Sequence, residues 1–238
     1  MSEQSIPENK ESYSVATYAR RFGLTRQALI NDDLDALSDI PRKMGRAARR
    51  LPNNLFWTEL VSNSGAGPVM QEGGGSLNLF HDNHASGDTS HADALAEAGL
   101  ATAFENLRKV IGLAATGATA PTLNLTPQFI VVPAALERTG RQLLTDVAAT
   151  TSGGVNVFSD VGLTLIVEPQ LDATSATKWY LVAGPTETDG AEIAFLNGNQ
   201  QPQQILVEGT NVLGLEWGVV LGVGVKFVGH RGWVRSGI

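Results

Sequence analysis

The chain has 238 residues, no cysteine and a formal net charge of −7. The lack of cysteine excludes disulfides, thiolate metal sites and cysteine nucleophiles. No apolar run reaches the ~20 residues of a membrane-spanning helix, and the polar start MSEQSIPENKES is unlike a signal peptide, so we expect a soluble protein with no membrane partner. The charge is uneven, because residues 1–63 hold nine Lys or Arg against eight Asp or Glu, and the remainder holds eight against sixteen.

The first thirty residues predict a polar arm followed by a hairpin. Residues 1–10 are polar and contain a proline, which is typical of a loosely ordered arm. From Glu11 to Ile30, aromatic and β-branched residues alternate on both sides of Gly23, which predicts two strands joined near 20–23. Three arginines gather at this tip and on the return strand, where they either contact another molecule or only solubilise the hairpin: Arg20, Arg21 and Arg26.

The longest helical pattern covers residues 27–63. Its apolar residues recur three or four positions apart: Leu37, Ile40, Met44, Ala47 or Ala48, Leu51 and Leu55. Basic residues form a second stripe on the same helix: Arg42, Lys43, Arg46, Arg49 and Arg50. We expect the apolar side to be buried and the basic stripe to face solvent or a partner. Pro41 and Pro52 each remove an N–H, which predicts breaks near both residues.

A Gly-rich loop and a group of histidines follow. The loop at 64–75 lacks the lysine, the preceding strand and the following helix that a phosphate-binding loop needs. His81, His84 and His91 lie close together with two aspartates, but they lack the i, i+4 spacing of a helical zinc site. We therefore expect hydrogen-bonded loop histidines and no metal, and we expect that changing His84 to Asn leaves assembly near normal.

The rest of the chain predicts two more helices and many strands. Helices are expected at 92–112 and 134–148 from their apolar spacing. Short strand-like runs are separated by Gly, Asp, Pro and Asn: 129–132, 163–167, 179–183, 193–196, 204–207, 219–228 and 233–235. Three helices and a mostly β second half place the chain in the α+β class.

The order of these segments and several short motifs resemble one protein family. The chain is similar to tailed-phage major capsid proteins of the Hong Kong 97 fold, and most of all to the Mu-type major head proteins. The stretches that carry the likeness are LTRQALINDDL at 24–34, LFWTELVSN at 55–63, LFHDNHAS at 79–86, LTPQFIVVPAALE at 125–137, VEPQLD and WYLVAGP within 167–185, and VKFVGHRGWVRSG at 225–237. Together they span nearly the whole chain.

The resemblance implies an architecture and a function. It implies an N-terminal arm and extended hairpin loop in 1–32, a peripheral domain with the long spine helix in 33–121, an axial domain in 122–200, and C-terminal strands completing the sheets in 201–238. It also implies a structural protein without a cofactor that assembles with itself into hexamers and pentamers of an icosahedral virion shell in the host cytoplasm. Portal proteins, decoration proteins and non-specifically bound double-stranded DNA are the further partners implied.

The sequence differs from its relatives in two respects and also fits two alternative functions. Relatives are often fused to a prohead protease, and none precedes the arm here, so we expect a processed form or an unfused gene. The segment 11–30 has no lysine, so we expect no Lys–Asn cross-link through it. The alternatives are an encapsulin-like compartment and, remotely, a metal-dependent hydrolase using the histidines. The residues expected at contacts between subunits are Arg20, Arg21, Arg26, Arg42, Lys43, Arg46 and Arg50.

Overall fold

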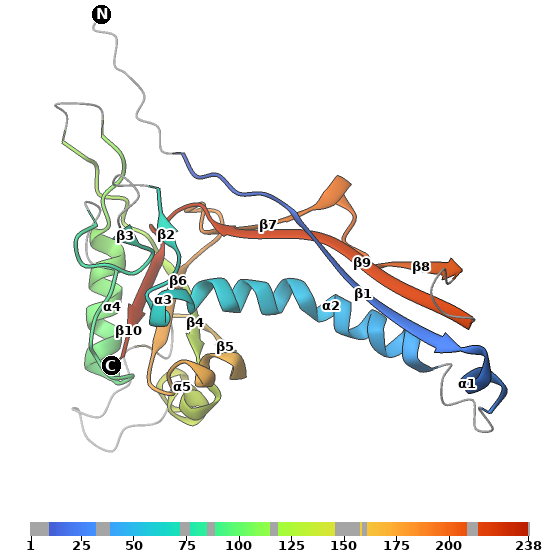
Figure 1. Cartoon of the computed structure of the whole chain (residues 1–238). Coiled ribbons are helices and arrows are strands. Elements are labelled where there is room, and N and C mark those ends of the chain that lie inside the picture. The colour runs from blue at the N-terminus through green and yellow to red at the C-terminus, as the bar shows by residue number, and fades with distance from the viewer. Residues whose placement is uncertain are drawn as a thin grey trace, which may run out of the picture. The chain divides into compact units, whose positions relative to one another are not determined.

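The structure is a computed structural model that describes residues 10–31, 39–71, 77–84, 89–114, 119–145, 158, 161–208 and 214–237. The chain divides into two compact units (Figure 1). Unit 1 comprises Met1–Glu11, Glu59–Glu192 and Phe227–Ile238, and unit 2 comprises Ser12–Thr58 and Ile193–Lys226. Within the described ranges, no helix has the length and apolar character needed to cross a bilayer.

Unit 2 is built on one long strand. Strand β9 (Gly214–Phe227) pairs antiparallel with β1 (Ala16–Thr25) on one side and with β8 (Gln203–Glu208) on the other, and β7 (Ala191–Phe195) also pairs with β9 on the side away from β1. Because side chains alternate along a strand, Val219, Leu221 and Val223 share one face and are all buried. The opposite face of β9 carries glycines, and a Cβ on Gly222 would lie 2.6 Å from Leu196.

The predicted hairpin between Glu11 and Ile30 is not formed. Residues 16–25 make one continuous strand, and Gly23 lies inside it opposite Glu216 rather than at a turn. Helix α1 (Arg26–Ile30) follows at once. Alternation along the sequence marks strand character but not the partner, and β9 offers ten paired positions where a short hairpin would offer far fewer.

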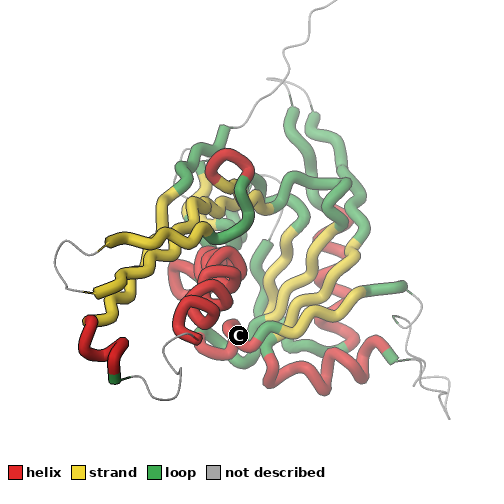
Figure 2. The backbone as a smooth tube through the Cα atoms, turned by 90° about the vertical axis from the view of Figure 1, so that its right-hand side faces the viewer, coloured by secondary structure: helices red, strands yellow, loops and turns green. Residues whose placement is uncertain are grey.

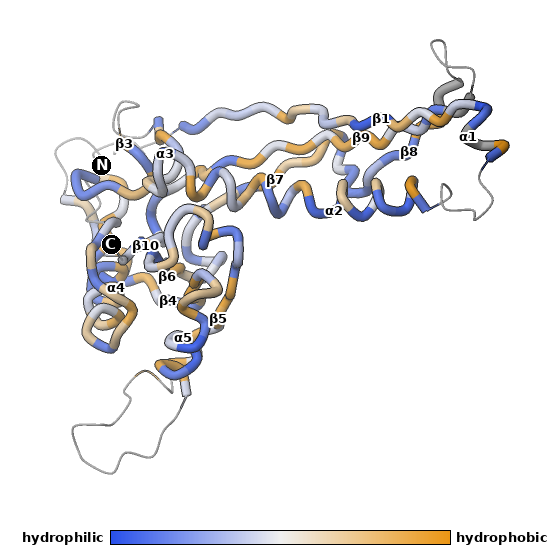
Figure 3. Tube along the Cα trace, turned by 60° about the horizontal axis from the view of Figure 1, so that its bottom comes forward, coloured by the Kyte–Doolittle hydropathy of each residue, from blue (hydrophilic) through white to orange (hydrophobic). Residues whose placement is uncertain are grey.

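Helix α2 (Asp39–Leu60) runs without interruption for 22 residues beside this sheet (Figures 1 and 3). The predicted breaks at Pro41 and Pro52 are therefore wrong. Pro41 lies in the first turn, where a backbone N–H has no partner within the helix, and Pro52 is tolerated inside the helix. The two predicted faces are present in the described residues, but the apolar one is half-buried and not buried, at Ile40, Met44, Ala48, Leu51 and Leu55, whereas all five basic residues are exposed. Leu37 lies outside the described residues.

Unit 1 contains a second four-stranded sheet in the order β10-β6-β4-β5, seen beside its helices in Figure 2. Its strands are β4 (Pro127–Val132), β5 (Thr164–Val167), β6 (Trp179–Ala183) and β10 (Trp233–Ser236). Strands β4 and β5 are parallel and the other pairs are antiparallel. Helix α4 (Glu97–Lys109) packs on β10 and β6, and α5 (Glu137–Leu144) packs on β5.

The core of unit 1 joins these elements. Leu100, Ala103 and Leu107 of α4 are fully buried with Ile130 of β4 and Trp179 of β6. The predicted helices are confirmed but shorter, since α5 begins after a 3₁₀ turn at Ala134–Leu136 and residues 146–148 fall outside the described ranges. Other short elements of the described residues are α3 (Ser62–Gly65), β2 (Val69–Met70), β3 (Leu77–Asn78) and the 3₁₀ turns Pro169–Ala173 and Leu196–Gly198. The α+β class is confirmed.

Candidate interaction surface

The two units carry opposite formal charges. Unit 2 holds nine Lys or Arg and six Asp or Glu, whereas unit 1 holds eight Lys or Arg and eighteen Asp or Glu. The formal charges are therefore +3 and −10. Such a division favours contacts between unit 2 and any polyanion, including the acidic unit of another copy of the chain.

The three arginines at the start of unit 2 do not form one cluster. Arg20 and Arg21 are consecutive on β1, so their side chains leave opposite faces of the sheet. Arg21 Nη1 lies 4.0 Å from Glu216 Oε1 of the paired strand β9. Arg20 and Arg26 are exposed, and Arg20 is on the sheet face that includes buried Leu24. Arg20 and Arg26 are thus more available to a partner than Arg21.

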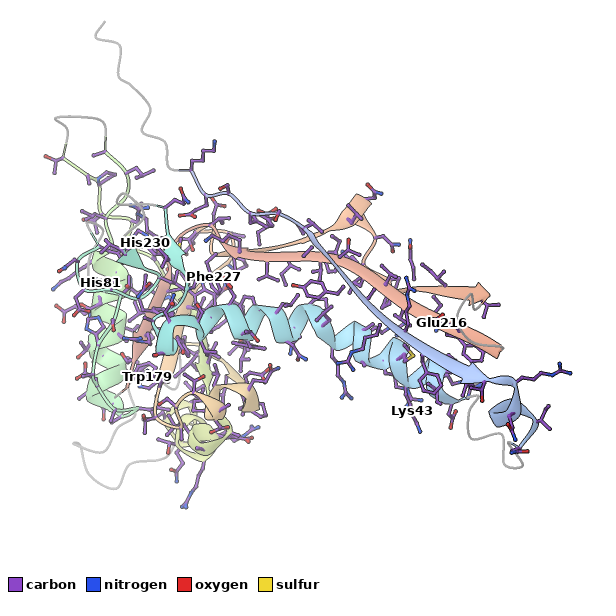
Figure 4. The ribbon with its side chains drawn as sticks, viewed as in Figure 1. Lys43, His81, Trp179, Glu216, Phe227 and His230 are labelled. Atoms are coloured by element: carbon purple, nitrogen blue, oxygen red, sulfur yellow. The ribbon has the colours of Figure 1, made fainter. Side chains whose placement is uncertain are left out.

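The basic residues of α2 form two rows. A helix turns about 100° per residue, so Arg42, Arg46 and Arg49 lie within about 60° of one another, and Lys43 and Arg50 lie to one side (Figure 4 labels Lys43). Arg42 Nη1 lies 3.6 Å from Asp39 Oδ1 one turn earlier, and both side chains are exposed. An exposed pair of this kind contributes little to stability, so it leaves Arg42 able to bind elsewhere.

The first row lines a pocket between α2 and the start of β8 with the two residues before it. The pocket has a volume of about 370 Å³ and is lined by Arg42, Gly45, Arg46, Arg49, Gln201, Pro202 and Gln204. Arg49 Nη2 donates to Gln201 Oε1 at 3.3 Å. Its lining residues include no carboxylate, so the pocket offers guanidinium and amide donors and suits an anion.

The sequence indicates only part of this pocket. The arginines lie in the predicted stripe, with Arg49 joining Arg42 and Arg46 of the expected contact residues. Nothing in the pattern indicates that Gln201 and Gln204 lie against a helix about 150 residues earlier in the chain. Gly45 gives no such signal either, because a Cβ at this position would have ordinary room beside Gln204.

The histidines have separate partners in unit 1 (Figure 4 labels His81 and His230). His81 Nδ1 accepts from the Asn83 amide at 3.0 Å, and His91 Nε2 accepts from Asn106 Nδ2 at 2.8 Å. His84 Nε2 donates to the Asn78 carbonyl oxygen at 2.7 Å, and its ring stacks on His230 with centroids 3.9 Å apart. The interpretation as hydrogen-bonded loop histidines is confirmed. No three His, Asp or Glu side chains of the described residues are placed to share a metal ion.

The burial of His84 changes the expected effect of its substitution. His84 is 6% exposed and His230 is 1% exposed, so the stacked pair belongs to the interior of unit 1. We expect His84→Ala to lower the free energy of unfolding by about 1–3 kcal/mol through the lost hydrogen bond and stack. Urea unfolding of the purified chain measures this. EDTA should leave the wild-type midpoint unchanged, and a midpoint that falls with EDTA would support a metal site instead.

A left-handed turn in unit 1 is held by two cations. Asn63, Ser64 and Gly65 are consecutive residues with φ of 50°, 60° and 84°, a run that L-residues rarely adopt. Lys178 Nζ donates to the Ser64 carbonyl oxygen at 3.1 Å, and Arg235 Nη1 donates to the Gly65 carbonyl oxygen at 2.6 Å. These bonds tie the carbonyls of the left-handed turn to the edge strand β10 and to the residue just before β6.

Burial around Arg235 also predicts a pH effect. Burial raises the pKa of Tyr180 to about 12, against a smaller opposing effect of the Arg235 charge. Between pH 10 and 12 the unfolded chain loses a proton that the folded chain keeps, so stability should fall by about 2–3 kcal/mol over this range. Burial and the Arg235 charge lower the pKa of Lys178, so the folded chain loses this proton at a lower pH than the unfolded chain. Lys178 should therefore add stability as the pH rises, against the loss caused by Tyr180.

Tyr180→Phe isolates this effect because the ring still packs against Phe80, with centroids 5.3 Å apart in the wild type. We expect the variant to lose less stability than the wild type from pH 9.5 to 11.5, as measured by urea unfolding at each pH. Equal slopes for the two proteins would show that Tyr180 does not keep its proton in the folded chain.

Comparison with known proteins adds to this geometry. A model of the phage capsid protein family matches residues 8–236. No curated protein sequence matches the chain. The fold is similar to the capsid of Myoviridae phage XM1, with a TM-score of 0.60 and 10% identity over 99% of this chain and 83% of that one. It is also similar to a chain of Mycobacterium phage Che8, with a TM-score of 0.51 and 16% identity over 93% and 70%.

One similar structure belongs to a different kind of shell. The holo-SrpI encapsulin complex of Synechococcus elongatus PCC 7942 gives a TM-score of 0.55 and 12% identity over 97% of this chain and 76% of that chain. At these identities the structural likeness shows the fold, and the family match rests on the sequence.

Proposed function

The chain belongs to the phage capsid protein family, and from this membership we propose that it is the major head protein of a Mu-type tailed phage. The observation that carries the proposal is the family match over residues 8–236, joined to a fold shared with phage capsids. Members of this family are structural proteins of the virion shell. In our proposal the copies form hexamers and pentamers that enclose double-stranded DNA, assembled in the host cytoplasm.

Exposed apolar residues support a role in assembly. Ile30 is 72% exposed, Leu206 is 59% exposed and Ile205 is 45% exposed, all in unit 2. Ile205 and Leu206 are consecutive on β8, so apolar side chains leave both faces of that strand. An exposed apolar strand at the edge of a sheet is a hazard for a monomer, but it is normal for a subunit whose neighbours cover it.

We extend the proposal to the parts of the shell. Residues 122–200, with β4, β5, β6 and α5, would form the axial domain at the capsomer centre, and 33–121 would hold the peripheral domain with α2 as its spine. Residues 1–32 would provide the arm and extended loop, and 201–238 the completing strands. Portal and decoration proteins are the other protein partners we propose.

Contacts between copies would use the basic residues of unit 2. We propose that Arg20, Arg21 and Arg26 meet the acidic unit 1 of a neighbouring copy. Exposed ion pairs are each worth about 0.2–1 kcal/mol, but a shell repeats them at every subunit. Arg42, Lys43, Arg46 and Arg50 face either a neighbour or the contents of the shell.

An encapsulin-like compartment is the second candidate, favoured by the similarity to the holo-SrpI encapsulin complex. It would have the same fold and the same self-assembly, but its contents would be protein. The two functions therefore differ in what the particle encloses and not in the subunit.

Negative-stain electron microscopy of the purified protein tests the proposal. We expect icosahedral or tubular particles, and a chain that stays monomeric at high concentration would contradict it. In lysates of infected or induced cells, DNA-filled particles joined to tails would support the phage head. A protein cargo that co-purifies with tailless particles would favour the compartment.

A further inference from the structure

The arginine pocket of unit 2 brings residues of α2 and β8 together. Gly45 is one of its lining residues, and an added Cβ there would come 3.7 Å from Gln204 Nε2. That distance is an ordinary van der Waals contact, so the pocket has room for a small side chain at position 45. The case for a binding site therefore rests on the side chains that line the pocket, and position 45 is where a substitution can probe it.

The donors around this space are arranged in a line. Arg42, Arg46 and Arg49 lie along about 10 Å of helix at 1.5 Å per residue. Gln201 and Gln204 add neutral amide groups from the facing segment, and Arg49 already bonds to Gln201. Five donor side chains thus face one open trough without a carboxylate among the lining residues. A ligand for this trough has to be an anion whose acceptors repeat along its length.

We propose that this pocket binds the phosphate backbone of double-stranded DNA, independently of sequence. DNA carries one negative charge per about 1.7 Å of its axis, so several phosphates lie within reach of the arginine row. A protein carboxylate would need a particular position and orientation to reach the arginines. The phosphates of DNA are regularly spaced, so some of them face the arginine row wherever the duplex lies along it. The inference rests on the proposed function, because an enclosed phage genome supplies this ligand at high concentration.

The formal charges of the chain limit the strength of such a site. Unit 1 at −10 repels DNA, and only the +3 unit attracts it. Binding by one subunit should therefore be weak and strongly dependent on salt, and useful through many copies facing the same polymer. Weak binding also suits a genome that has to slide during packaging.

Two test variants and two control variants of the full chain test the site. Gly45→Glu places a carboxylate in the pocket beside the arginines, at a position with ordinary room for a Cβ, and Gly45→Ala is its control. Arg46→Gln/Arg49→Gln removes two of the lining charges. Arg108→Gln/Arg138→Gln removes two exposed charges from unit 1 as the matched control. Circular dichroism confirms folding, and sedimentation confirms that the titrated sample is unassembled.

Fluorescence anisotropy with two 20-bp duplexes of unrelated sequence gives the readout. The wild type should bind both duplexes equally, with a log–log salt slope of about −3. Gly45→Glu and Arg46→Gln/Arg49→Gln should each weaken binding at least about tenfold, and the double substitution should reduce the slope by about 2. Gly45→Ala and Arg108→Gln/Arg138→Gln should stay within about twofold of the wild type.

Other outcomes overturn the inference without touching the shell function. Wild-type affinity in Gly45→Glu, or absence of binding by the wild type at low salt, would show that the pocket does not hold DNA. Displacement of the duplex by poly-glutamate at equal charge concentration would assign the pocket to an acidic segment of a neighbouring subunit. Electron microscopy of Gly45→Glu separates the two proposals, since its particles should form as in the wild type.

Discussion

Replacing Arg20 and Arg26 by glutamate is expected to leave a folded protein that does not form shells at low salt. Both side chains are exposed on unit 2, so their substitution should change the free energy of unfolding by no more than about 0.5 kcal/mol each. In the lattice, each reversed charge would approach the −10 unit of a neighbour as a like charge. The same penalty recurs at every subunit, so assembly is lost although folding is kept.

Salt and two controls separate this effect from other causes. Screening acts over about 8 Å at physiological ionic strength, so high salt should restore part of the assembly. Arg20→Gln/Arg26→Gln should be intermediate, because it removes attraction without adding repulsion. Arg21→Glu brings a carboxylate toward Glu216 of its own chain, so it should affect stability more and assembly less. Light scattering and electron microscopy measure assembly, and normal shells from the Glu double variant at low salt would contradict the proposed contact.

Local patterns in the sequence predicted the elements that depend on local chemistry. The two faces of α2 follow from residues three or four apart, and β6 is found at the predicted residues 179–183 because five consecutive apolar residues fill a buried strand. The strand that pairs with β1 could not be predicted in this way. Ala16 pairs with Val223, more than two hundred residues away, and no local pattern distinguishes that arrangement from a hairpin.

Two parts of the candidate sites also depend on distant residues. The arginine pocket needs Gln201 and Gln204 brought to α2, and the sequence predicts only its basic row. The left-handed turn at Asn63–Gly65 reads in sequence as the start of a loop rich in glycine. Lys178 and Arg235, which lie more than a hundred residues later in the chain, donate to its carbonyl oxygens. The conformation of the turn therefore cannot be predicted from the residues beside it in the sequence.

Arg235 should therefore be among the most sensitive positions of unit 1. Its guanidinium donates to the Gly65 carbonyl oxygen at 2.6 Å and to Ser90 Oγ, and its central carbon lies 5.6 Å from the Phe80 ring centroid. Gly65 is buried, so Arg235→Ala would leave its carbonyl oxygen without this donor inside the unit. We expect a loss of about 3 kcal/mol, or about 6–12 °C in Tm.

The location of the loss distinguishes a clamp on the turn from a general weakening. Hydrogen exchange followed by mass spectrometry should speed up in peptides covering 59–71 and 227–237, while 16–25 and 214–226 exchange as in the wild type. Arg235→Lys should lose less, because one ammonium can reach one of the two acceptors. Arg108→Ala is the matched control, since its hydrogen bond to Asn124 is exposed and its loss should cost less than about 0.5 kcal/mol. A Tm for Arg235→Ala within 2 °C of that control would show that the strained turn holds its own conformation, because the clamp would then contribute less than about 1 kcal/mol.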